Sequence, residues 1–102
     1  MIIVRTVLQA EFGKGGEVAA EFVRAAGQMQ SELGTERRWR VLTDLSGPFD
    51  TVVQEVEAES MAAWEQARAR LFGLASFRES MTRIQGMIVS GRNELWTVEG
   101  DG

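Results

Sequence analysis

The segment ERRWRVLTDLSGPFDTVVQEVEAESMAAW, residues 36–64, decides the fold of this chain. Its polarity alternates from Arg37 to Leu45, which is the period-two signature of a half-buried strand. Ser46-Gly47-Pro48 interrupts the run, because proline has no amide donor and glycine tolerates dihedral angles that other residues avoid. Val52 to Ala58 follows, with three valines and with glutamates at the alternating positions 55 and 57. The pattern predicts two antiparallel strands that are joined by a loop.

Centring the turn between Gly47 and Pro48 fixes a register for this hairpin. The register predicts four opposed pairs: Arg40–Glu55, Arg38–Glu57, Trp39–Val56 and Thr43–Val52. Cross-strand pairs of opposite charge, or of an aromatic and a β-branched side chain, each stabilise a register by roughly 0.2–1 kcal/mol.

The remaining segments also show clear periodicity. Ile2 to Ala10 alternates and predicts a first strand. Apolar residues recur every three or four positions from Val18 to Leu33, which predicts a helix that ends at Gly34. Ser60 suits the N-cap of a second helix that ends at Gly73. The first helix is expected to expose Glu17, Glu21, Arg24, Gln28 and Glu32, and the second to bury Met61, Trp64, Ala67 and Leu71.

A third helix, or a kinked continuation of the second, follows Gly73. Ser76 and Glu79 have the spacing of a capping box, in which each side chain accepts from the other residue's backbone amide. Phe77, Met81 and Ile84 are expected to be buried, and Arg92 to Glu99 predicts the last strand.

The order of elements is strand, helix, strand, strand, split helix, strand. This order predicts an α+β, ferredoxin-like βαββαβ fold, with an antiparallel four-stranded sheet and helices on one face. A length of 102 residues indicates a single domain that spans the whole chain.

Composition excludes several classes of function. The 11 Lys and Arg are interspersed among 15 Asp and Glu, for a net charge of −4, which argues against a nucleic-acid surface. The chain has no Cys, His or Tyr, so thiolate and imidazole chemistry are excluded and no metal or cofactor is expected. No apolar run approaches the roughly 20 residues of a membrane span, and we expect a cytoplasmic protein.

Two loop motifs favour a structural role over a ligand. Gly13-Lys14-Gly15-Gly16 lacks the spacing of a phosphate-binding loop, so a turn is expected. Asp44 and Asp50 flank the hairpin loop without further acidic groups, which favours turn capping over a cation site.

Three segments resemble the NIPSNAP-type domain family. The Gly-Pro, the Val-Val strand and the helix start of this family are found in the run SGPFDTVVQEVEAESMAAWEQARARLFG. The first strand and helix of the family resemble IVRTVLQAEFGKGGEVAAEF, and its last strand resembles IVSGRNELWTV. The resemblance covers nearly the whole chain. It implies a dimeric α+β barrel, related to the antibiotic-biosynthesis monooxygenase-like barrels. Val7 stands where relatives often have an aromatic residue, and Gln54 where some have histidine.

The sheet face without helices is expected to bind a second copy. It combines apolar and polar side chains, namely Ile3, Val7, Leu42 and Val53 with Arg5, Gln9, Arg40 and Glu55. Such a face is too apolar to remain in water, so two copies are expected to pack sheet against sheet as a homodimer. The third strand has two possible orientations. The alternating positions that include Val52 and Gln54 are the more apolar set, which predicts that they face the helices. The family comparison predicts instead that Gln54 faces the interior of the barrel.

Five residues are candidate ligand contacts: Arg5, Trp39, Arg40, Gln54 and Glu55. The planar guanidinium of Arg5 suits a carboxylate or an enolate, although an interface ion pair with Glu55 is the alternative. The tryptophans, including Trp64 and Trp96, either line a pocket or serve as core anchors. We rank small-molecule binding in the barrel first, a cofactor-independent monooxygenase-like enzyme second and a structural or interaction protein third. No catalytic residue is assigned.

Overall fold

The computed structural model describes residues 1–102. Its elements in chain order are β1 (Ile2–Ala10), α1 (Gly15–Leu33), β2 (Trp39–Thr43), β3 (Thr51–Ala58), α2 (Met61–Phe72), α3 (Ala75–Ile84), the short 3₁₀ turn η1 (Gln85–Met87) and β4 (Ile88–Thr97). The strands form one antiparallel sheet in the order β2-β3-β1-β4. The predicted α+β, ferredoxin-like fold with a split second helix is confirmed.

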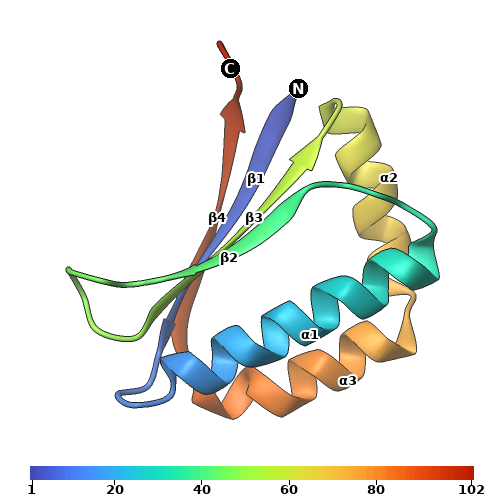
Figure 1. Cartoon of the computed structure of the whole chain (residues 1–102). Helices are drawn as coiled ribbons and strands as arrows, with labels where there is room; N and C mark the ends of the chain where they lie inside the picture. The colour runs from blue at the N-terminus through green and yellow to red at the C-terminus, as the bar shows by residue number, and fades with distance from the viewer.

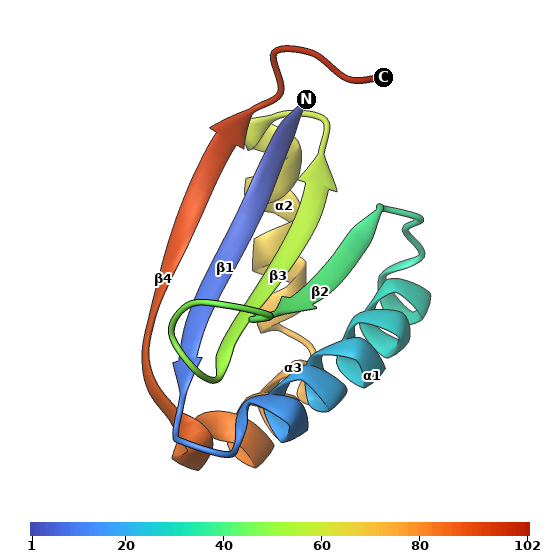
Figure 2. The same cartoon turned by 60° about the vertical axis from the view of Figure 1, so that its left-hand side comes forward.

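All three helices lie on one face of the sheet, and the other face is open (Figures 1 and 2). The loop between β2 and β3 projects from the open side, and both chain termini lie at the same end of the sheet. None of the helices combines the length and the apolar character that crossing a membrane requires.

The predicted hairpin register is confirmed. Trp39 lies opposite Val56, Arg40 opposite Glu55 and Thr43 opposite Val52. Arg38 precedes the strand, yet its carbonyl accepts from the backbone amide of Glu57. The Arg38 side chain also lies 3.7 Å from the Glu57 carboxylate.

Two strand boundaries differ from the prediction. β2 is shorter than Arg37–Leu45, because the carbonyl of Arg37 accepts a hydrogen bond from the Gln30 side chain of α1 instead of joining the sheet. β4 begins at Ile88 rather than Arg92, because it pairs along the whole of β1 with a register shift between Gln9 and Ala10.

The two loop aspartates cap backbone amides, as predicted. Asp44 accepts from the amide of Thr51 at 3.0 Å, and Asp50 accepts from the amides of Gly13 and Gly15 at 2.9 Å each. Asp50 thereby ties the β2–β3 loop to the start of α1. A Cβ at Gly15 would lie 2.8 Å from the Asp50 carboxylate, so this junction needs glycine.

The hydrophobic core lies between the C-terminal end of β1 and the helices α1 and α3. It consists of Ala10, Val18, Phe22, Val52 and Ile84, all of them buried. Leu8 packs beside this cluster, and it lies so close to Gly91 of β4 that a Cβ there would be 2.5 Å from its Cδ2. Only 14 of the 102 residues are buried, so a single copy leaves much apolar surface accessible.

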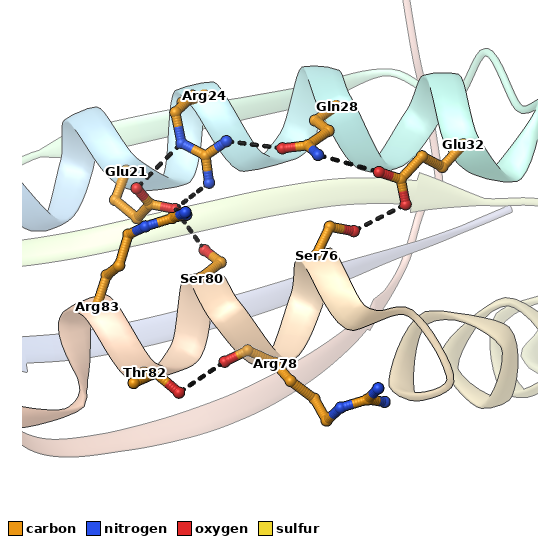
Figure 3. A network of polar contacts seen from close by, with 9 residues as sticks. All are labelled: Glu21, Arg24, Gln28, Glu32, Ser76, Arg78, Ser80, Thr82 and Arg83. Atoms are coloured by element: carbon orange, nitrogen blue, oxygen red, sulfur yellow. Dashed lines mark hydrogen bonds and ion pairs between the residues drawn. The ribbon is translucent and has the colours of Figure 1, made fainter.

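A polar seam joins α1 to α3 (Figure 3). The Glu21 carboxylate is only 11% exposed and accepts from Arg24 of its own helix and from Ser80 and Arg83 of α3. In the last turn of α1, Glu32 accepts from Ser76 at 2.8 Å. The predicted exposure of Glu21 is therefore wrong, whereas Glu32 is exposed as predicted and accepts from Ser76 as well.

The predicted capping box of Ser76 and Glu79 is also wrong. α3 begins at Ala75, its N-cap is Leu74, and no side chain caps its first turn. Ser76 already lies inside the helix, where its hydroxyl donates to the carboxylate of Glu32. A charged acceptor on the neighbouring helix makes that bond stronger than a bond to a neutral backbone group.

The Glu21 seam predicts a defined loss of stability in acid. The hydrogen bond from Arg24, together with those from Ser80 and the charge of Arg83, lowers the pKa of Glu21 from 4.5 to about 2. Because the folded pKa is the lower one, the contribution is complete above pH 4.5 and is lost as the pH falls toward 2. Urea unfolding of wild type and Glu21→Gln should differ most above pH 5 and converge toward pH 2. A difference independent of pH would contradict this account.

Candidate functional site

A cavity of about 140 Å³ lies between the sheet and the three helices, next to the hydrophobic core. Most of its lining is apolar: Val4, Phe22, Ala25, Ala26, Met29, Leu33, Trp39, Val56, Trp64, Ala67, Leu71, Phe77 and Met81. The helix α2 covers it without having a single fully buried residue of its own. The cavity is therefore a gap in the packing beneath the least deeply packed helix.

Several polar groups in the cavity lining have no partner within the chain. Gln54 of β3 lies on the cavity wall, and its side-chain amide makes no hydrogen bond to the protein. The indoles of Trp39 and Trp64 also line the cavity without an intramolecular acceptor, whereas Trp96 donates to Glu94. Unpaired donors and acceptors on an apolar wall are available to a bound molecule.

The rim of the cavity carries two arginines. Arg37 precedes β2 and donates to the carbonyl of Ala63 at 3.3 Å, and Arg70 of α2 donates to the carbonyl of Leu33 at 2.8 Å. They are the only charged residues among the twenty that line the cavity. Both contacts hold α2 against the rest of the rim.

A row of alternating charges crosses the open face of the sheet. Arg40 of β2 binds Glu55 of β3 at 2.7 Å, and Arg5 of β1 lies 3.6 Å from both Glu55 and Glu94. Glu94 of β4 also accepts from Arg92 and Trp96, and these hydrogen bonds lower its pKa. The Nε of Arg5 is buried without a hydrogen bond. Apart from the Nε of Arg5, these charged groups pair with one another on the open face, and the cavity lies on the opposite face of the sheet.

The structure divides the five candidate ligand contacts between the two faces. Arg5, Arg40 and Glu55 lie together in the charged row, as the alternative ion-pair interpretation predicted. Gln54 and Trp39 line the cavity beneath the helices, although Trp39 also borders a groove at the open face.

The family-based orientation of β3 is wrong for this chain. Gln54 faces the helices together with Val52 and Val56, as the apolar parity of the strand requires. Glu55 and Glu57 face the open side, where they pair with arginines of the neighbouring strands.

Sequence reasoning missed the arginines at the rim. Arg37 lies in the connection before β2, but in the alternating pattern it has the same parity as Trp39, which lines the same cavity, and that alternation was the available signal. Arg70 stands three residues after Ala67, at the margin of the apolar stripe of α2, and that spacing was the available signal.

Neither a protein-family sequence model nor a curated protein sequence matches this chain. Solved structures do match it. A NIPSNAP-like domain protein from Burkholderia xenovorans superposes with a TM-score of 0.84 at 19% identity, covering 99% of this chain and 87% of that one. A NIPSNAP domain protein from the same organism gives 0.81 at 16% identity, covering 96% and 94%.

This chain has the NIPSNAP-type fold. The fold extends to SnoaB, a cofactor-independent oxygenase from Streptomyces nogalater, with a TM-score of 0.71 at 16% identity and coverage of 98% and 94%. The resemblance seen in the sequence is thus confirmed as a likeness of fold.

Proposed function

We propose that this NIPSNAP-type protein binds a small, largely apolar molecule in the cavity between its sheet and helices. The observation that carries the proposal is the cavity of about 140 Å³, in which the Gln54 amide and two indoles have no partner. An apolar cavity of about 150 Å³ accommodates one benzene molecule. The ligand is accordingly one ring or an aliphatic group of equal size, hydrogen-bonded at one edge to Gln54.

We also propose that the protein forms a homodimer through its open sheet face. Leu42 and Trp96 are 37% and 56% exposed on that face, so exposed apolar groups flank the charged row. Face-to-face packing of two sheets would cover them. In this arrangement the barrel interior holds the ion pairs, and the ligand site stays within each copy.

Filling the cavity should abolish binding. Ala67 lines it from α2, and the substitution Ala67→Phe places a ring in the space that the ligand needs. Calorimetry with benzyl alcohol, a neutral probe, should give a dissociation constant in or below the millimolar range for wild type and no binding for Ala67→Phe. Ala62→Phe, on the exposed side of the same helix, is the control and should bind like wild type. Equal binding by both variants would place the probe elsewhere.

A cofactor-independent oxygenase is the second candidate function. SnoaB, a cofactor-independent oxygenase, has a similar fold. The rim arginines and the Gln54 amide could stabilise the anion of an electron-rich substrate that then reacts with dioxygen. The cavity contains no carboxylate or imidazole base, however, so the substrate would have to enter as its anion. Oxygen consumption with a panel of phenols and anthrones, sensitive to Ala67→Phe, would support this function, and no consumption would exclude it for those compounds.

A further inference from the structure

The distribution of counter-ions singles out the rim of the cavity. Seven of the eleven basic side chains lie within ion-pair distance of a carboxylate: Arg5, Lys14, Arg24, Arg38, Arg40, Arg83 and Arg92. Four have no such partner: Arg37, Arg68, Arg70 and Arg78. Two of these four, Arg37 and Arg70, line the same cavity. In a chain with net charge −4, the cavity is thus a place of uncompensated positive charge.

We infer that the ligand is a monocarboxylate, whose anionic group lies at the rim between Arg37 and Arg70 while its apolar body enters the cavity. This inference rests on the proposed binding function and specifies the chemical class of the ligand. A guanidinium presents its donors in a planar fork that matches a carboxylate, and each arginine uses only one terminal nitrogen for a backbone carbonyl.

The size of the cavity limits the anion to a simple one. About 140 Å³ leaves room for one ring but none for a second charged group, and no residue of the apolar wall would compensate one there. The unpaired amide of Gln54 lies on the cavity wall, where it suits a single neutral polar substituent. An aromatic acid with one ring satisfies the three conditions: an anion at the rim, a single ring in the cavity, and no second charged group.

The contacts of Arg70 couple the anion to the helix that covers the cavity. Arg70 bonds the carbonyl of Leu33, the last residue of α1, where the helix dipole is negative. The same contact gives Arg70 a structural role, so loss of stability in a variant does not test the inference. A difference in affinity between an acid and its neutral analogue does test the inference, because only contact between Arg70 and the anion produces such a difference.

Calorimetry with benzoate and benzyl alcohol on the full chain measures that discrimination. Wild type should bind benzoate at least tenfold more tightly than benzyl alcohol. Arg70→Ala and Arg37→Ala should each lose most of this ratio while still binding benzyl alcohol. Arg70→Lys should retain part of it, because the charge remains and the fork is lost. Arg68→Ala is the matched control, since Arg68 also has no carboxylate partner but stacks on Phe72 outside the cavity, and its ratio should stay at the wild-type value.

The affinities for the two probes distinguish a failure of the carboxylate inference from a failure of the proposed binding function. If benzyl alcohol binds as tightly as benzoate to wild type, the carboxylate inference is wrong while the binding function stands. If neither probe binds, both are wrong. If Arg68→Ala lowers the ratio as much as the rim variants do, the preference reflects overall charge, and the assignment to Arg37 and Arg70 is overturned. Should Arg70→Ala fail to fold, the Arg37→Ala ratio and the salt dependence of benzoate binding to wild type decide the question.

Discussion

Phe22→Ala is expected to lower the free energy of unfolding by about 3–5 kcal/mol, the usual cost of removing a buried aromatic side chain. Phe22 is 6% exposed and joins the core cluster from α1, where Val18, Val52 and Ile84 surround it. It also lines the cavity, so the truncation enlarges an existing void instead of letting the neighbours collapse. Domains of this size have about 5–15 kcal/mol of stability in total. Chemical denaturation should therefore find the variant close to unfolding.

Phe12→Ala is the matched control for that experiment. Phe12 is 85% exposed in the loop after β1, and its ring lies edge-on to that of Phe49 at a centroid distance of 6.1 Å. Its removal should cost less than about 1.5 kcal/mol. Equal losses for the two variants would mean that the helices do not pack on the sheet as described.

Arg5→Ala is expected to cost about 2–3 kcal/mol, between the values for exposed and for fully buried ion pairs. Arg5 lies between Glu55 and Glu94, whose side chains are 12% and 23% exposed. Without it, Glu55 keeps Arg40 and Glu94 keeps Arg92, but these two poorly solvated carboxylates lose the cation that lies between them on β1. The same side chain stands at the centre of the open face, so the proposed homodimer should also weaken. Denaturation and light scattering at matched concentrations measure the two effects.

Arg38→Ala is the control on the same face. Its side chain is 82% exposed and meets Glu57 at 3.7 Å, which makes it an ordinary surface ion pair worth less than about 1 kcal/mol. An Arg5→Ala variant as stable and as associated as Arg38→Ala would contradict the central role of the charged row. A wild-type chain that scatters as a single copy at micromolar concentration would contradict the homodimer itself.

The sequence allowed the sheet to be predicted because its signals are local. The alternation around Arg40 and Glu55 predicts both the register and the face of each side chain. Asp44 and Asp50 likewise indicate the position of the turn, whose backbone amides they cap. Apolar parity also predicts the orientation of Gln54 correctly where the comparison with a family does not.

The cavity and the helical seam could not be predicted in the same way. A cavity is what packing leaves unfilled, and its volume depends on how α2 is placed relative to residues distant in the sequence, such as Val4 and Val56, which line the cavity. The pattern of α1 places Glu21 on its polar side, but only the position of α3 decides that Ser80 and Arg83 meet it there. Ser76 likewise has a capping pattern in the sequence, and a carboxylate on another helix takes its hydroxyl instead.

The indole N–H resonances of the three tryptophans, observed by NMR during titration with benzoate, test most directly where the ligand binds. Trp39 and Trp64 line the cavity, whereas Trp96 lies on the open face with its N–H bonded to Glu94. Single Trp→Phe variants assign the three signals. Binding beneath the helices predicts saturable shifts for Trp39 and Trp64 and none for Trp96. A shift confined to Trp96 would place the ligand on the open sheet face and contradict the account.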